Sequence, residues 1–382
     1  MWRFTSLCQG DYPRPIYGST ETWRIGKSSA TGSILSPSYK RAIILAMKVS
    51  ELGEFGLIDL LAKMVSSSKS KQSAPWQQVI LGIGDDTAAW HGEAGTQLVT
   101  TDSLFQDIHF TLKTTPWQEL GWKTLAVNVS DIAAMGGVPK YALISLALPG
   151  NTEVADVTAL YQGMIELAQQ FEVAIVGGDT SRAPLVSITI TVLGKAKNQD
   201  GGILTRSAAK PGDKIAVTGS LGAAAAGLEM LTNQLQFSPE ATAQLRNAFL
   251  HPWPRVTEGQ LLVAQGVKTA IDISDGLISD LNHICQSSKV GARVEVDQVP
   301  ISPVVKANFG DRALELALSG GEDYELLFTA SADIIDRVKE TVSCPVTVIG
   351  EIIADKIGEI ALVDLNGKPF PLPKTGWEHF AT

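Results

Sequence analysis

Cysteine is scarce in this sequence of 382 residues, and the spacing of its few cysteines excludes two classes of site. The three cysteines, Cys8, Cys285 and Cys344, are far apart and form no C-x-x-C pair. This spacing argues against a disulfide scaffold and against a cysteine-ligated zinc site. We therefore expect a protein of a reducing compartment, the cytoplasm.

Excess positive charge and long apolar runs are also lacking. The formal net charge is −9, and Lys and Arg form no stripe or dense run. Proteins that bind nucleic acid need a basic surface against the phosphates, so we expect no nucleic-acid partner. No apolar run reaches the roughly 20 residues of a membrane-spanning helix, so we expect no membrane partner.

The common nucleotide-binding motifs are incomplete. Segment 21–28 ends in Gly-Lys-Ser like a Walker A motif, but Glu21 stands where its first glycine belongs. The dinucleotide fingerprint fails at Thr87, the position of its third glycine. The glycine loop and catalytic motifs of protein kinases are missing. The turn Gly219–Gly222, ahead of an alanine-rich helix, fits either a phosphate cradle or an ordinary tight turn.

Acidic residues follow a series of short apolar runs. Such runs, ended by Gly or Asp, are typical of buried strands that lead into a loop. Carboxylates held close together, with few Lys or Arg residues nearby, either take up protons or bind cations. The pattern predicts a magnesium site of several carboxylates, which is the kind of site that holds polyphosphates. The acids are Asp85 and Asp86 after Val79–Ile83, Asp102 after Leu98–Val99, Asp131 after Leu125–Val129, Asp179 after Val173–Val176, and Asp272 and Asp275 within Ala270–Asp275.

The segment Trp117–Ala134 has two interpretations. Its apolar spacing fits a strand over Leu125–Val129 and fits a longer helix equally well. Gly136 and Pro139 would end such a helix. We expect the helix, with Asp131 on the side that faces the site.

The composition divides the chain into three parts. Residues 1–46 are rich in Ser, Arg, Tyr and Pro, and we interpret them as a poorly ordered leader or as the result of a mis-assigned start, with Met47 as the true one. A transit peptide is the third alternative. The remainder predicts an N-terminal domain over 47–197 and a C-terminal domain over 203–382, separated by the polar loop Asn198–Gly202. Because strands alternate with helices in both, we expect two α/β or α+β units.

Seven sequence blocks carry a resemblance to a known family. They are GIGDD at 82–86, TTDSLFQDIHF at 100–110, NVSDIAAMGG at 128–137, GGDT at 177–180, TRSAAKPGD at 205–213, DISDGLISDL at 272–281 and SGGEDYEL at 319–326. In this order they make the chain resemble thiamine-monophosphate kinases from about Gly53 to Phe380. The resemblance implies the two-domain fold of the aminoimidazole ribonucleotide synthetase superfamily, with an N-terminal magnesium- and ATP-binding domain. It also implies a homodimer in which these N-terminal domains pair through a sheet.

The same resemblance assigns roles to single positions. It implies that Asp131 and Arg206 are catalytic, and that Gly178, Asp179, Arg206 and Ser274 bind ATP. It implies that thiamine monophosphate contacts His109, Glu322 and Trp377. The implied magnesium ligands are Asp86, Thr100, Thr101, Asp102, Asp131, Asp179, Asp272 and Asp275. The sequence departs from the family pattern at Phe105-Gln106-Asp107, beside His109.

The implied reaction is transfer of the γ-phosphoryl group of ATP to thiamine monophosphate, in line and with magnesium, to give thiamine diphosphate. Two alternatives remain: another ATP-dependent enzyme of the superfamily, of the ligase or selenophosphate synthetase type, and a catalytically silent nucleotide-binding protein.

Several candidate residues also have simpler explanations. Asp102 and Asp131 could cap helices, and Glu322 or its neighbour Asp323 could cap the next strand. His109 could be a core histidine whose hydrogen bonds are satisfied within the protein, and Trp377 could pack the C-terminal region. We expect Asp280 to be a solvated helix acid.

Overall fold

A computed structural model describes residues 44–69, 73–83, 87–197 and 202–371. Most of the expected leader, the acids Asp85 and Asp86, and Trp377 lie outside these ranges. Within them, no helix is long and apolar enough to cross a membrane.

The first half of the described chain forms a small mixed sheet. Strand β6 pairs antiparallel with both β3 and β4, and β4 pairs parallel with β5, so the order is β3-β6-β4-β5. The parallel pair is joined through helix α6, which is the usual crossover for parallel strands. These strands are β3 (Gln97–Phe105), β4 (Gly137–Leu148), β5 (Ala174–Arg182) and β6 (Ser187–Ala196), and the helices beside them are α2 (Val49–Leu52), α3 (Glu54–Ser68), α4 (Ala74–Gln78), α5 (Trp117–Ala134) and α6 (Val154–Gln170).

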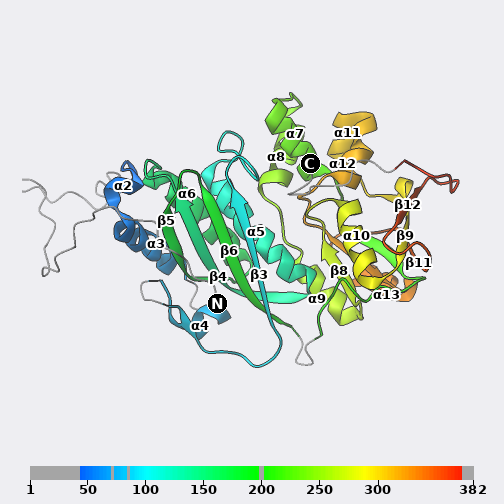
Figure 1. The fold of residues 1–382 in the computed structure, drawn as a ribbon, viewed down its shortest axis with the longest axis horizontal. Helices are drawn as coiled ribbons and strands as arrows, with labels where there is room; N and C mark the ends of the chain where they lie inside the picture. Colours follow the sequence, from blue (N-terminus) through cyan, green and yellow to red (C-terminus); the bar gives the residue numbers. More distant parts are fainter. Residues whose placement is uncertain (1–43, 70–72, 84–86, 198–201, 372–382) are drawn as a thin grey trace, which may run out of the picture. The chain divides into compact units, whose positions relative to one another are not determined.

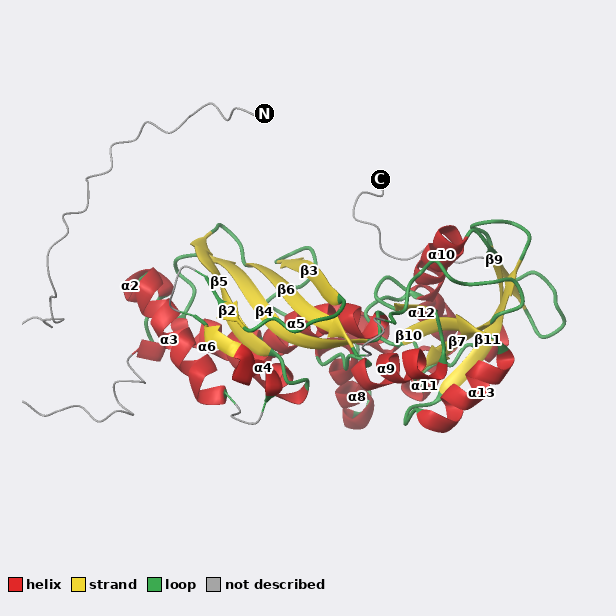
Figure 2. Ribbon diagram, turned by 90° about the horizontal axis from the view of Figure 1, so that it is seen from below, coloured by secondary structure: helices red, strands yellow, loops and turns green. Residues whose placement is uncertain are grey.

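Helices α5 and α6 cover one face of this sheet (Figure 2), and they cross very closely. A Cβ atom on Gly121 of α5 would lie 1.8 Å from the carbonyl oxygen of Leu160. A Cβ atom on Gly163 of α6 would lie 1.8 Å from the carbonyl oxygen of Gln118. Only glycine at both positions permits the two helices to approach this closely. The crossing fixes the position of α5 along its axis relative to the strands.

The opposite face of the sheet is covered at one end only, as far as the described residues go. The hairpin of β1 (Val79–Leu81) and β2 (Ala89–Trp90) packs there against Tyr141, Ala174 and Val176. Beyond the hairpin the face is open, and Val99 of β3 is 71% exposed on it.

The second half of the described chain, coloured from green to red in Figure 1, forms a six-stranded sheet of order β12-β9-β11-β7-β10-β8. All its pairs are antiparallel except β12 with β9. One face packs against α10 and α12, and the other against α9 and α13. Its elements are β7 (Lys214–Thr218), α7 (Ala223–Asn233), α8 (Pro239–Leu250), α9 (Val256–Gln265), β8 (Thr269–Asp272), α10 (Leu277–Ser288), β9 (Gly291–Glu295), η1 (Val296–Gln298), α11 (Pro303–Phe309), η2 (Gly310–Arg312), α12 (Ala313–Ser319), β10 (Leu326–Ala330), α13 (Ala332–Thr341), β11 (Val346–Ile353) and β12 (Ile360–Val363).

Helix α5 joins the two halves, since it also contacts α9 and β8. Its Trp122 donates a hydrogen bond of 3.0 Å from Nε1 to the carbonyl of Pro252. The Trp122 ring lies 6.2 Å from that of Trp253, which in turn lies 5.0 Å from Phe171. These tryptophans therefore pack the proline-rich joint between the halves.

The structure confirms the helix over Trp117–Ala134 and corrects several other expectations. Gly53, whose φ is 77°, separates α2 from α3. Strand β3 continues past Thr101, so Asp102 lies within the strand rather than after it, and Asp179 likewise lies within β5.

Candidate functional site

The C-terminal half of α5 supplies polar side chains to the junction between the two sheets. Asn128 is buried, and its Oδ1 accepts a hydrogen bond of 3.0 Å from the backbone N–H of Asp102 on β3. Ser130 donates a hydrogen bond of 2.7 Å to Oδ2 of Asp272, at the end of β8. Successive positions of one helix thus fix two strands that belong to different halves of the chain.

Three carboxyl groups converge at this junction. Asp102 hydrogen-bonds Asp131, and the negative charges of both raise the pKa of Asp272. Burial, followed by the charge of Asp131, raises the pKa of Asp102 to about 6 and that of Asp272 to about 7. Burial also raises the pKa of Asp131. Buried carboxylates that repel one another favour a proton or a cation between them.

Two further predicted residues lie at this carboxyl cluster. Thr100, on the same face of β3 as Asp102, donates a hydrogen bond to Oδ2 of Asp131. The charge of Arg206 opposes the rise in the pKa of Asp131 and of Asp272, so the guanidinium group is close to both. Arg206 is exposed, which leaves it accessible to an anionic ligand.

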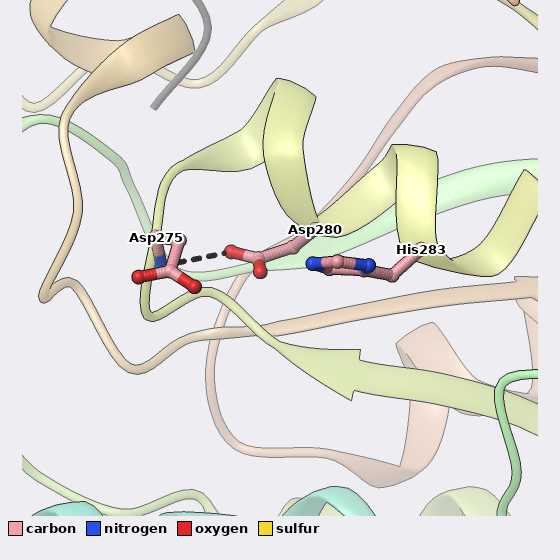
Figure 3. A group of neighbouring side chains, drawn as sticks. All are labelled: Asp275, Asp280 and His283. Carbon is pink, nitrogen blue, oxygen red and sulfur yellow. Dashed lines mark hydrogen bonds between the residues drawn. The ribbon is translucent and has the colours of Figure 1, made fainter. Parts of the chain in front are cut away.

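The loop after β8 is held by Asp280, from the first turn of α10. A single oxygen of Asp280, Oδ2, accepts backbone hydrogen bonds of 3.1 Å from Ser274 and from Asp275. Figure 3 shows Asp280 between Asp275 and His283, and the three offer ligand atoms within 4.8 Å of one another. The expectation that Asp280 is solvated is wrong, because its side chain is 1% exposed and burial raises its pKa well above the usual value.

Glu322, one of the residues predicted to contact thiamine monophosphate, lies next to the Ser274–Asp275 loop. Its backbone N–H donates a hydrogen bond of 2.8 Å to the carbonyl of Ser274. Its Oε2 lies 2.8 Å from Nζ of Lys123, on α5. His109 lies in the turn after β3, where its Nδ1 accepts a hydrogen bond of 3.0 Å from the backbone N–H of Phe105.

Three predicted residues are not brought to the carboxyl cluster within the chain. Thr101 faces the open side of the sheet, where it hydrogen-bonds Thr191. Asp179 shares a register row with Thr189 and Ser103, which hydrogen-bond each other on that same side. Gly178 shares a row with Asp102 but three strands away, which is about 14 Å at the usual strand spacing. Asp86 and Trp377 lie outside the described residues.

The donor set at the carboxyl cluster fits a hard divalent cation. Every candidate ligand there is a carboxylate or hydroxyl oxygen, as Mg²⁺ prefers. The raised pKa values mark carboxyl groups that lack sufficient positive charge nearby. Asp102, Asp131 and Asp272 would hold the ion, with Asp275 in the adjoining loop.

Sequence reasoning missed four residues that support these groups: Lys123, Asn128, Ser130 and Asp280. The first three lie within one helix and, with Thr124 and Asp131, place charged or polar groups at five of the nine positions 123–131. Polar residues at such spacing on an apolar helix signal a buried polar face. That signal was available, and it identifies α5 as the helix that positions the site.

Comparison with known proteins agrees with the resemblance in the sequence. The sequence model of the AIR synthase related protein, N-terminal domain, matches residues 84–196, and that of the C-terminal domain matches residues 210–363. The thiamine-monophosphate kinase of Escherichia coli (strain K12) is 40% identical over 336 residues, which is 86% of this chain and 99% of that protein. The chain belongs to the thiamine-monophosphate kinase family.

Solved structures of thiamine-monophosphate kinases share the fold. The crystal structure of the enzyme from Stenotrophomonas maltophilia K279a aligns with a TM-score of 0.72 and 37% identity, over 81% of this chain and 96% of that chain. The structure "AaThiL complexed with AMPPCP and TMP" aligns with a TM-score of 0.66 and 33% identity, over 87% of this chain and 99% of that chain.

Proposed function

We propose that this protein transfers the γ-phosphoryl group of ATP to the phosphate of thiamine monophosphate, giving ADP and thiamine diphosphate. The observation that carries the proposal is the buried cluster of Asp102, Asp131 and Asp272, with Arg206 beside it, in a chain of this family. A relative that is complexed with AMPPCP, an ATP analogue, and TMP supports both substrates.

The chemistry asks the protein for charge neutralisation rather than for a base. The second pKa of a phosphate monoester is about 6, so the acceptor oxygen is already largely anionic at neutral pH. The difficulty is the approach of two polyanions. Arg206 can grip a phosphate through two parallel hydrogen bonds. Asp102, Asp131 and Asp272 would hold magnesium, which would supply positive charge against the phosphates during transfer.

The proposed roles divide between the two substrates. We assign Gly178, Asp179, Arg206 and Ser274 to ATP. We assign His109, Glu322 and Trp377 to thiamine monophosphate, whose cationic thiazolium ring suits a carboxylate and an aromatic ring. The proposed magnesium ligands remain Asp86, Thr100, Thr101, Asp102, Asp131, Asp179, Asp272 and Asp275.

We also propose a homodimer, and the open face of the small sheet supports it. Exposed apolar side chains such as Val99 suit contact with a second copy of the chain. Thr101 and Asp179 face the same way, so sheet pairing would bring the partner close to both. We further propose a division into domains 47–197 and 203–382, and a cytoplasmic location that fits the free thiols of Cys285 and Cys344.

The test incubates purified protein with ATP, thiamine monophosphate and magnesium, and separates the products by chromatography. We expect ADP and thiamine diphosphate in equal amounts, and neither product when EDTA is present. Asp131→Ala should abolish turnover without lowering the melting temperature, because it removes a ligand rather than packing. Asp333→Ala, at an exposed position of α13, is the matched control and should stay active.

Other outcomes point elsewhere. ADP without thiamine diphosphate would keep the ATP site and direct the search for an acceptor to the ligase-type relatives. Absence of both products from the untreated protein, or full activity of Asp131→Ala at saturating magnesium, would contradict the proposal.

A further inference from the structure

The side chain of Lys123 is fully buried, although it carries a cationic group. It lies on α5 with 1% of its surface exposed. Lysine is almost never buried to this extent unless it is paired. No role was expected for it from the sequence.

Two partners from other elements enclose the ammonium group. Its Nζ lies 2.8 Å from Oε2 of Glu322, in the loop before β10. It also lies 3.5 Å from the centre of the Phe249 ring, on α8, in cation–π geometry. Burial lowers the pKa of Lys123, and the carboxylate of Glu322 opposes that change. The pair thus joins the two halves of the chain.

Glu322 sits in a constrained loop and remains accessible. Its φ of 70° is unusual for a residue with a side chain. Its side chain keeps 29% of its surface exposed, whereas that of Lys123 keeps 1%. One end of the ion pair is therefore fixed in the protein interior, and the other faces the region of the predicted acceptor.

We propose that Lys123 is a positioning residue, which acts through Glu322 to hold this carboxylate oriented toward the cationic acceptor. The inference rests on the proposed function, because it takes thiamine monophosphate as the ligand of Glu322. A buried ion pair contributes little net stability, since desolvation offsets the attraction. Placement of a ligand-binding carboxylate accounts for keeping such a pair.

The test measures the KM values for both substrates in Lys123→Met, which keeps the length of the side chain and removes the charge. The KM for thiamine monophosphate should rise about tenfold or more, equivalent to roughly 1.4 kcal/mol, while the KM for ATP changes less than about twofold. The matched control is Lys214→Met. It breaks another Lys–Glu pair, to Glu351 at 3.0 Å within the larger sheet, and should leave both KM values unchanged.

A double-mutant cycle separates positioning from a structural role. If Lys123 acts through Glu322, adding Lys123→Met to Glu322→Gln should change the acceptor KM little further. Equal losses in the KM for ATP and for the acceptor, or additive losses in the cycle, would overturn the inference.

A milder variant covers the case in which Lys123→Met does not fold. Phe249→Leu keeps an apolar neighbour and removes the ring beneath the ammonium group. It should raise the KM for thiamine monophosphate selectively, and an unchanged value would overturn the inference. Calorimetry separates the two proposals: wild-type protein that does not bind thiamine monophosphate overturns both, whereas equal binding by wild type and Lys123→Met overturns this one alone.

Discussion

Asp280 holds the Ser274–Asp275 loop through one carboxylate oxygen that accepts two backbone hydrogen bonds. We expect Asp280→Ala to release the loop, because each bond contributes about 1 kcal/mol. A displacement of about 1 Å in Ser274 and Asp275, which we propose to bind ATP and metal, should cost on the order of 100-fold in rate. Steady-state kcat, with the melting temperature as a check on folding, measures the effect.

The matched variant is Asp280→Asn, which keeps an oxygen able to accept both hydrogen bonds. It should retain most activity if Asp280 positions the loop. A loss as large as that of Asp280→Ala would instead mean that the carboxylate binds metal with Asp275 and His283.

Single residues also mark the limit of sequence reasoning. Asp102, Asp131 and Asp272 were predictable, because acids after apolar segments stand out against their neighbours. The burial of Asp280 was not, because an acid in the first turn of a helix commonly faces water and favours the positive end of the helix dipole. Its hydrogen bonds reach only five and six residues back along the chain, but residues 319–322, which are distant in sequence, pack against the same loop. Local spacing does not encode that second contact.

At the scale of elements, the N-terminus of α7 is occupied by a side chain from the same chain. Asp323 accepts hydrogen bonds of 2.6 Å from the N–H of Gly222 and 3.1 Å from that of Ala224. Of the two interpretations of the Gly219–Gly222 turn, this favours the ordinary turn over a phosphate cradle. Asp323 therefore caps a helix that is distant in sequence, rather than the strand that follows it.

This cap makes stability depend on pH. Burial raises the pKa of Asp323 from 3.8 to about 7, against the effect of the helix N–H groups. The folded protein therefore binds a proton that the unfolded chain has lost between about pH 4 and pH 7, so stability falls as pH rises through this window and is level above it. In EDTA, the melting temperature of wild type should fall more between pH 5 and pH 8 than that of Asp323→Asn, by a few degrees.

Comparing wild type with Asp323→Asn isolates the contribution of Asp323 to the pH dependence, because the other buried acids titrate in both proteins. Melting curves followed by circular dichroism at several pH values provide the measurement. Parallel pH dependence in the two proteins would show that Asp323 does not carry a raised pKa.

Element order explains another part of what the sequence did not predict. Strands and their acids could be located, but β3 and β5 lie at opposite edges of the small sheet. Alternation along a strand gives two faces without saying which is buried, so the sequence did not show that Asp102 and Asp179 face opposite sides of the sheet. Pairing order arises from contacts between distant segments, such as the α5–α6 crossing.

At the scale of the whole molecule, the open sheet face predicts the oligomeric state. Val99→Arg should disrupt a sheet-paired dimer, because a charge would be buried without a partner. Light scattering should give twice 40.7 kDa for wild type and 40.7 kDa for the variant. Ile357→Arg, at a position 65% exposed in the other half of the chain, should leave the mass unchanged. A monomeric wild type at micromolar concentration would contradict the proposed dimer.

The hydrogen bond from Ser130 to Asp272 joins residues 142 positions apart. A ribosome delivers the earlier segment first. Asp102 and Asp131 therefore leave the ribosome well before the strand that supplies Asp272. The carboxyl cluster does not exist on a nascent chain until that strand has been made and docked against α5. The proposed ion site is thus a property of the finished polypeptide, and we expect a chain truncated before residue 272 to lack it, however well its first sheet has folded.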